Sequence, residues 1–254
     1  MPDSGYTDLL GFGENLSTVV IGASGGIGSA LVAALAAEPA VKRVFAAARS
    51  ELVDLPPKAS ALQLDLANEP SLERAAAKCA ASGGLDIVIV ASGVLHDEVA
   101  GLRPEKRWTE LRADSLARAF AINCSGPALA AKHFLPLLAT GRRSVFAALS
   151  ARVGSIGDNR LGGWYAYRAS KAALNMMIRT LAIELERVNP SALCIGLHPG
   201  TVDTRLSAPF QSGVPAEQLF SPEQAARQLL SVISEAGPSD SGRVLAWDGQ
   251  VIAP

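Results

Sequence analysis

Short runs of apolar residues alternate with longer amphipathic stretches along most of the chain. The apolar runs are four to six residues long and rich in Val, Ile, Leu and Ala, which is typical of parallel strands buried on both faces. The longer stretches have apolar residues at helical spacing. We predict strands at Thr18–Ile21, Arg43–Ala47, Ala61–Leu64, Asp86–Val90, Ser144–Leu149, Ala192–Leu197 and Arg243–Ala246. We predict helices at Gly28–Ala37, Ser71–Ala81, Asp114–Leu138, Tyr167–Arg187 and Pro222–Glu235.

The alternation of strands and helices predicts the fold class. Successive strand–helix–strand units form doubly wound α/β sheets, and their right-handed crossovers place helices on both faces of a parallel sheet. We therefore predict a single Rossmann-type domain over residues 1–254, with a seven-stranded parallel sheet. The sequence has no linker between domains and no repeat with a period of about 20–50 residues.

The least regular region is the segment 199–222, which is rich in Pro, Ser, Thr and Gly and directly follows a predicted strand. In this architecture ligands bind at the carboxyl edge of the sheet, where that strand ends. We expect the segment to be a flap over the substrate. An ordinary surface loop is the alternative interpretation.

Composition and charge exclude several classes of function. The formal net charge is −1, with no long run of one sign, so the basic surface that binds nucleic acid is absent. No stretch approaches the roughly 18–20 apolar residues that span a bilayer. Residues 1–14 contain acidic but no basic side chains, unlike a secretory signal. We expect a cytoplasmic protein without a membrane or nucleic-acid partner.

The cysteines and histidines are few and widely spaced. No pair has the spacing of metal ligands, so we predict no metal site and no disulfide framework. The cysteines fit small buried positions in a reducing compartment. These residues are Cys79, Cys124, Cys194, His96, His133 and His198.

A glycine-rich turn, GASGGIG at positions 22–28, directly follows the first predicted strand. Gly22 permits a tight turn, Gly26 leaves the backbone open to a phosphate, and Gly28 lets the following helix pack closely on the strand. The free amides and the positive end of that helix then face an anion. This context predicts a dinucleotide site that includes Ser24 and Ile27 together with the three glycines.

The end of the second strand determines the choice of cofactor. Arg49 lies there, twenty-one residues after Gly28, in the region where an acidic residue would bind the ribose 2′-hydroxyl of NAD. A guanidinium pairs instead with a 2′-phosphate, so Arg49 favours NADP over NAD. A solvated surface arginine is the alternative. Asp65 and Leu66, at the end of the third strand, are assigned to the same site, although Asp65 can equally cap the helix that follows.

Tyr167 and Lys171 begin a predicted helix and lie about 40° apart on one of its faces. A hydride that reaches a carbonyl carbon leaves an alkoxide, which must take a proton. The ordinary pKa of tyrosine is near 10, and a neighbouring ammonium favours the phenolate, which brings that pKa closer to working pH. The pair therefore suits acid–base chemistry at a carbonyl or alcohol. Tyr165 has no such partner because position 169 is Ala.

The two motifs Gly22-x-x-x-Gly26-x-Gly28 and Tyr167-x-x-x-Lys171 resemble the short-chain dehydrogenase/reductase family, and the resemblance covers essentially the whole chain. Positions 154–175 are most similar to the branch that contains the sniffer carbonyl reductases and the C-factor-like proteins. The resemblance implies an oxidoreductase that transfers a hydride between NADP(H) and a small carbonyl or alcohol substrate. It also implies a homodimer or homotetramer formed through the two long helices.

The resemblance assigns roles to three residues near the reacting atoms. Tyr167 is expected to be the acid/base. Lys171 is expected to hold the nicotinamide ribose and to lower the pKa of Tyr167. Asn123 matches a helix asparagine that supports a proton-relay water, although a core polar residue bonded to backbone is the alternative.

The segment after the sixth strand resembles the family's turn over the nicotinamide. Pro199 and Gly200 form this turn, Val202 is expected to contact the carboxamide, and Thr204 is expected to contact the phosphates.

The chain departs from the family pattern after its fourth strand. Ala91, Ser92 and Gly93 stand where the family usually has Asn-Ala-Gly, after a first Asn that is Val90 here. The backbone can still contact the adenine ribose, so these three residues stay in the predicted cofactor site.

A second departure concerns the catalytic serine. The family commonly has Ser-Ser-x-x-Gly after the fifth strand, and the second serine orients the carbonyl, but here that position is Ala151. The adjacent Ser150 is the favoured replacement. Ser155, twelve residues before Tyr167, and the absence of any catalytic serine are the alternatives.

Two functions follow from these observations. The first is an NADP-dependent carbonyl reductase or alcohol dehydrogenase. The second is a cofactor-binding signalling or regulatory protein with little turnover, which the C-factor resemblance and Ala151 suggest. The intact Tyr167, Lys171 and Asn123 favour the enzyme.

Overall fold

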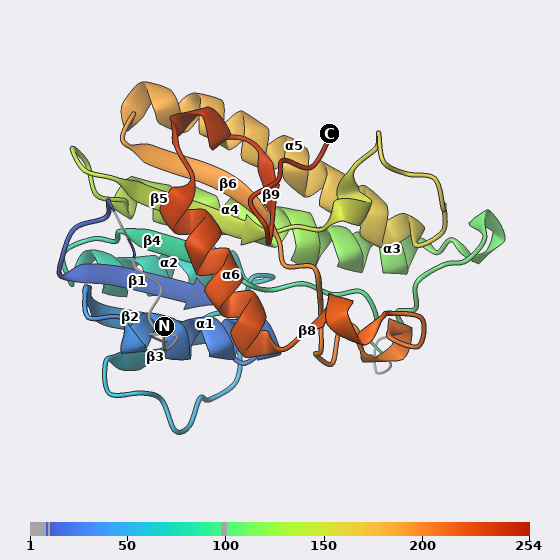
Figure 1. The fold of residues 1–254 in the computed structure, drawn as a ribbon, viewed down its shortest axis with the longest axis horizontal. Helices are drawn as coiled ribbons and strands as arrows, with labels where there is room; N and C mark the ends of the chain where they lie inside the picture. The colour runs from blue at the N-terminus through green and yellow to red at the C-terminus, as the bar shows by residue number, and fades with distance from the viewer. Residues whose placement is uncertain (1–8, 10, 98–100) are drawn as a thin grey trace.

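A computed structural model describes residue 9 and residues 11–97 and 101–254 (Figure 1). All seven predicted strands form, and they pair in parallel in the order β3-β2-β1-β4-β5-β6-β9. The doubly wound Rossmann-type sheet is thereby confirmed. The order reverses between β1 and β4, so a crevice for ligands is expected at their carboxyl ends. The strands are β1 Leu16–Ile21, β2 Val41–Ala48, β3 Ala59–Gln63, β4 Ile87–Val90, β5 Ser144–Leu149, β6 Ala192–His198 and β9 Val244–Ala246.

Helices cover both faces of the sheet (Figure 1). α1 and α6 pack on one face, and α2, α4 and α5 pack on the other. Among the helices in the described ranges, none combines the length and apolar character needed to cross a bilayer. The helices are α1 Gly26–Ala37, α2 Glu69–Ala80, α3 Ala113–Phe120, α4 Gly126–Phe134, α5 Tyr165–Val188 and α6 Pro222–Glu235.

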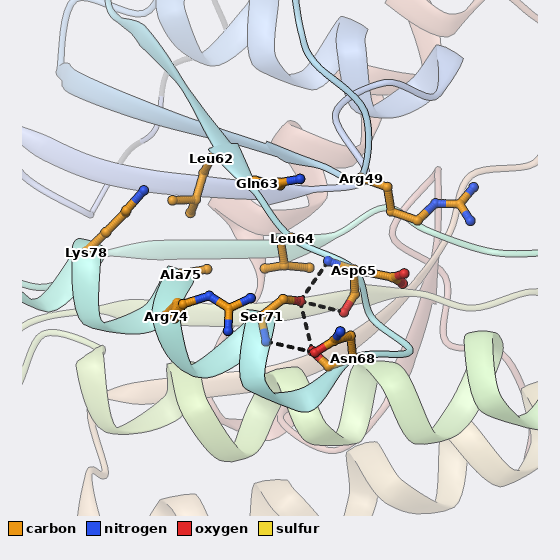
Figure 2. A pocket seen from close by; sticks show the side chains of 10 residues that line it. All are labelled: Arg49, Leu62, Gln63, Leu64, Asp65, Asn68, Ser71, Arg74, Ala75 and Lys78. Carbon is orange, nitrogen blue, oxygen red and sulfur yellow. Dashed lines mark hydrogen bonds between the residues drawn. The ribbon is translucent and has the colours of Figure 1, made fainter.

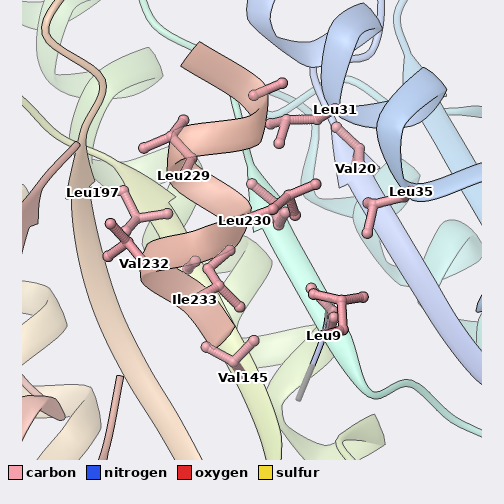
Figure 3. Packing of buried hydrophobic residues seen from close by; sticks show 14 of the residues in the cluster. Leu9, Val20, Leu31, Leu35, Val145, Leu197, Leu229, Leu230, Val232 and Ile233 are labelled. Atoms are coloured by element: carbon pink, nitrogen blue, oxygen red, sulfur yellow. The ribbon is translucent and has the colours of Figure 1, made fainter. Parts of the chain in front are cut away.

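Two apolar cores lie between the sheet and the helices, one on each face of the sheet. Successive strand residues point to opposite faces, so in β1 Val20 faces α1 and α6, whereas Val19 and Ile21 face the other helices. Figure 3 shows Leu229, Leu230 and Ile233 of α6 against the first of these faces. Because both sides of each central strand are buried, the strand sequences are apolar without alternation.

The helix predicted at Asp114–Leu138 is wrong as a single element. α3 ends at Phe120, a π-helical turn spans Ala121–Ser125, and α4 begins at Gly126. Pro127 has no amide hydrogen to donate to the carbonyl of residue 123, and its ring crowds that carbonyl. The Gly126 amide instead donates to Ala121 O, five residues back. The extra residue in this turn lies at Asn123, one of the predicted site residues.

The segment 199–222 contains more regular structure than the sequence indicates. β7 (Thr201–Val202) and β8 (Leu219–Phe220) pair in parallel and join its two ends. The side chains of Val202 and Phe220 pack together with Ala225 of α6. The two ends of the segment are therefore fixed to the domain, and residues 203–218 connect them.

Candidate active site

The glycine-rich turn lies between β1 and α1 and has almost no room for side chains. Gly22 has φ +94°, and a Cβ atom there would lie 2.4 Å from Ser92 Oγ. A Cβ atom at Gly28 would lie 2.1 Å from Gly22 O. Both positions therefore require glycine, one because of its left-handed backbone and its neighbours and the other because α1 packs directly on the turn. The end of β4, at Ala91 and Ser92, is thus held against the turn.

The segment 199–222 also contacts this turn. A Cβ atom at Gly26 would lie 2.9 Å from Thr204 Cγ2, and Ile27 packs against Val202 and Phe220. Ser24 is exposed. The structure thus brings Thr204 to the start of α1, where free helix amides attract an anion.

A polar cavity of about 330 Å³ lies beside the ends of β2 and β3 (Figure 2). Arg49 and Asp65 both line it. Asp65 Oδ1 accepts from the Ala67 amide at 2.9 Å, whereas the N-cap of α2 is Asn68, whose side chain accepts from the Ser71 amide at 3.2 Å. The alternative that Asp65 caps α2 is therefore excluded.

Two further residues of the predicted cofactor site, Leu66 beside Asp65 and Gly200 in the turn after β6, have closely packed surroundings. Leu66 is buried in the core, and a Cβ atom at Gly126 would lie 2.8 Å from Leu66 Cβ. Gly200 has φ +74° and faces the rings of Phe220 and Trp247. Both are packing positions that fix the adjacent backbone.

Asn123 and Lys171 meet behind the end of β4. The Asn123 side chain accepts from the Val94 amide and donates to Val94 O, both at 2.8 Å, and donates to Ser170 Oγ at 3.0 Å. A Cβ atom at Gly93 would lie 3.5 Å from Asn123 Oδ1 and 3.6 Å from Lys171 Nζ. Asn123 therefore makes the backbone bonds expected of a core polar residue, and its side chain also lies with Lys171 beside Gly93.

Lys171 is buried, with an exposed fraction of 2%. Its Nζ donates to Leu149 O at 2.8 Å and lies 5.8 Å from the centroid of the Tyr167 ring. Burial lowers the pKa of Lys171 to about 8, an effect that Cys124 opposes. Burial raises the pKa of Tyr167 to about 12. In the protein alone, therefore, desolvation governs both groups, and the tyrosine is a phenol near neutral pH.

The two candidate serines differ in what they contact. Ser150 directly follows β5, and its hydroxyl donates to Asn175 Oδ1 of α5 at 2.6 Å. The Ser155 hydroxyl accepts from the Asp158 amide and donates to Pro254 O. Ser150 therefore lies beside Leu149, whose carbonyl accepts from Lys171, whereas Ser155 supports a turn and the last residues of the chain.

Aromatic rings from three loops gather beside Tyr167. Trp164 lies at the N-cap of α5 and makes an edge contact with Tyr167 at a centroid distance of 6.3 Å. The ring centroid of Phe210, in the segment 199–222, lies 5.0 Å from that of Trp164 and 5.8 Å from that of His96. Trp164 has φ +51°, which is unusual for a bulky residue. Through Trp164, Tyr167 is therefore joined to a cluster of rings that includes Phe210 and His96.

The described residues include no group of His, Cys, Asp or Glu that could hold a metal. All three cysteines are free and buried. His133 contacts Glu69, and burial lowers the pKa of His198 to about 4.

The comparison with protein families identifies the chain. The model of the family described as short chain dehydrogenase matches residues 17–214. This chain belongs to the short-chain dehydrogenase family. The matched range includes the glycine-rich turn, Asn123, Tyr167 and Lys171, so the resemblance inferred from the two motifs is confirmed.

Several known members resemble this short-chain dehydrogenase. It is 36% identical over 189 residues to 1-hydroxy-2-glutathionyl-2-methyl-3-butene dehydrogenase of Rhodococcus sp. (strain AD45), covering 73% of this chain and 76% of that protein. It is 35% identical over 180 residues to C-signal of Myxococcus xanthus, covering 69% and 96%. The NADPH-bound carbonyl reductase from chicken fatty liver shares the fold with a TM-score of 0.82 and 24% identity, over 99% of this chain and 100% of that chain.

Sequence reasoning missed two features of this family member. Ser170 joins Asn123 to α5, and its position beside Lys171 in the motif gave a usable signal. Glu105 is buried beneath the start of α5, although the surrounding sequence, Arg103–Arg107, looks like a charged surface loop.

Proposed function

We propose that this short-chain dehydrogenase reduces a carbonyl compound to an alcohol with NADPH, or catalyses the reverse reaction. The proposal rests on one observation, the convergence of Tyr167, Lys171 and Asn123 at the sheet edge that also carries the glycine-rich turn. The NADPH bound by the chicken carbonyl reductase, which has the same fold, supports the cofactor assignment.

The residues present fit a dinucleotide phosphate. Gly22 and Gly26 place no side chain at the start of α1, and Thr204 lies next to Gly26. Arg49 is exposed and has no ion-pair partner among the described residues, so its guanidinium is available for a 2′-phosphate. When bound, the nicotinamide supplies or accepts the hydride.

The protein's own residues handle the proton. Tyr167 donates it to the oxygen of the carbonyl during reduction and removes it from the alcohol during oxidation. The Lys171 ammonium stabilises the phenolate that remains and binds ribose hydroxyls. Asn123 holds the Val94 backbone beside Lys171 and supports a relay water. Ser150 stays our candidate for a hydroxyl that acts on the carbonyl.

The lining favours a substrate with apolar substituents. Trp164 contacts Tyr167 and in turn packs against Phe210, and Ala151 replaces the serine that commonly orients the carbonyl. Packing of the substrate against the rings then contributes more to its orientation than hydrogen bonding does.

The test is NADPH oxidation with a panel of aldehydes and ketones that vary in size and polarity. We expect turnover, with higher kcat/KM for apolar carbonyls. The alternative is a signalling or regulatory protein, which the 35% identity to C-signal suggests. It predicts NADPH binding without turnover across the whole panel, and that result would reject the enzymatic proposal.

Replacing Arg49 by Ala is expected to weaken NADPH binding. Charge-assisted hydrogen bonds contribute about 1.5–3 kcal/mol, so the Kd for NADPH should rise about 10- to 100-fold while the Kd for NADH stays constant. Titration of both cofactors by fluorescence measures this difference. Arg74→Ala, which alters another cation of the same cavity, is the control. Unchanged affinities for both cofactors would mean that Arg49 is a solvated surface arginine, and equal losses for both would mean that it does not bind the 2′-phosphate.

The proposal includes a cytoplasmic homo-oligomer. α5 exposes the apolar side chains of Met176, Met177 and Ile183. Contact between two copies through this helix would bury them, in agreement with the expected dimer or tetramer.

A further inference from the structure

Glu105 is a buried acidic residue in an exposed loop. The loop connects β4 to α3, and its residues 106–112 are all exposed, whereas Glu105 has an exposed fraction of 3%. Burial of a carboxylate costs free energy unless it is hydrogen-bonded. The inward orientation of this side chain therefore indicates a specific contact.

That contact is the beginning of α5. Glu105 Oε2 accepts from the Ala166 amide at 3.1 Å, and Glu105 O accepts from the Trp164 amide. The helix has no cap from its own N-cap side chain, because that residue is Trp164. The Glu105 side chain, from a distant loop, therefore acts as an N-cap side chain usually does. It binds a first-turn amide, that of Ala166, which has no partner within the helix.

A second residue holds the same turn from the other side. Arg168 donates through Nε to the carbonyls of Gly162 and Gly163 and through Nη1 to Val153 O. The left-handed backbone of Trp164 lies between the two sets of bonds. The first turn of α5 is therefore held by bonds from Glu105 and from Arg168, and not by helix propensity alone.

Tyr167 directly follows Ala166, so the turn that Glu105 holds is the turn that carries the phenol. We propose that Glu105 is a positioning residue, which fixes the first turn of α5 so that the Tyr167 hydroxyl faces the reacting oxygen. The inference rests on the proposed acid–base role of Tyr167. Glu105 itself touches neither the substrate nor the cofactor.

Three variants test the proposal at saturating NADPH with one carbonyl substrate. Glu105→Ala removes the acceptor, and since misplacement by about 1 Å can cost 10²-fold, kcat should fall about 10- to 100-fold. Glu105→Gln keeps an acceptor oxygen and should retain kcat within about 3-fold of the unmodified protein. Glu110→Ala is the matched control, because Glu110 is exposed in the same loop and also accepts from a backbone amide, that of Lys106 at 2.7 Å; it should leave kcat unchanged.

The rate is divided by the concentration of protein that binds NADPH, so that unfolded protein does not lower the measured kcat. A purely structural role would lower the Tm of Glu105→Ala but leave this kcat unchanged, and such a result would overturn the proposal. Equal losses in the Ala and Gln variants would also overturn it, because the amide keeps the hydrogen bond. If Glu105→Ala does not fold, Glu105→Asp, whose shorter side chain withdraws the oxygens from Ala166, should show the same loss of kcat.

Hydrogen exchange separates this proposal from the proposed function. In Glu105→Ala the amides of residues 165–169 should exchange faster, and those of residues 174–185 should not change. If the unmodified protein reduces no carbonyl, the proposed function fails, yet faster exchange confined to residues 165–169 still supports the positioning of this turn. Unchanged exchange at residues 165–169 overturns the inference whatever the activity.

Discussion

Replacement of Tyr167 by Phe is expected to lower kcat for carbonyl reduction by about 10²–10⁴-fold, the usual contribution of a positioned general acid. The ring of Tyr167 packs against Trp164, and Phe keeps that contact, so the fold and the Kd for NADPH should not change. The loss should appear in kcat and kcat/KM together, because the hydroxyl acts in the transition state. Steady-state kinetics with NADPH and fluorescence titration of the cofactor measure the two quantities.

Tyr165→Phe is the matched control for this variant. Tyr165 lies two residues earlier in the same helical turn, and its replacement by Phe removes the same atom, a phenolic oxygen. Four residues after Tyr165, however, the chain has Ala169 where a lysine partner would be needed. Its kcat should equal that of the unmodified protein. Turnover by Tyr167→Phe at the rate of this control would show that the proton comes from another group.

Replacement of Lys171 by Met is expected to abolish most activity and to change how stability depends on pH. Without the ammonium, no cation next to Tyr167 stabilises the phenolate, so kcat should fall at least about 10²-fold. In the unmodified protein, kcat for reduction should decline above about pH 8, because the pKa of Lys171 is about 8 and the charged fraction then falls with each pH unit. The pH profile of kcat measures this decline.

The stability effect follows from the same lowered pKa. Between pH 8 and the ordinary lysine value of 10.5, the unfolded chain binds a proton that the folded protein does not, so the free energy of unfolding rises with pH. At about 1.4 kcal/mol per pKa unit, the rise is about 3 kcal/mol. Denaturant unfolding at pH 7 and pH 11 should show this gain in the unmodified protein relative to Lys171→Met.

The exposed Lys42 supplies the control for the pH dependence. Lys42→Met should keep the gain of stability between pH 7 and pH 11, because it leaves the buried Lys171 in place. If the free energy of unfolding changed with pH equally in Lys171→Met and in the unmodified protein, the lowered pKa of the buried Lys171 would be contradicted.

Local patterns in the sequence predict the sheet and most helices well. The buried strands are short apolar runs, and β5 and α6 form over the predicted residues 144–149 and 222–235. The break in the helix at 114–138 was also encoded locally, by Pro127, but apolar periodicity continues across it. The side chain of Asn123, within this turn, is held by Val94, a residue distant along the chain.

The candidate site could be predicted where neighbours along the chain create it. Gly22, Gly28, Tyr167 and Lys171 have fixed spacing within one turn or one helix. Glu105 could not be predicted in this way, because its partner amide lies 61 residues away and the adjacent side chains are charged. The contacts of Ser150 likewise depend on the approach of α5 to the end of β5.

The π-helical turn at residues 121–125 changes how the amphipathic faces of α3 and α4 are oriented relative to each other. An extra residue in one turn rotates everything after it by about 100° relative to a continuous α-helix. α3 and α4 therefore follow two helical phases, although their sequences look like one amphipathic stretch. A helical wheel drawn through both assigns the wrong face to one half. Surface mutations or dimer contacts in this region should be planned for residues 113–120 and 126–134 separately.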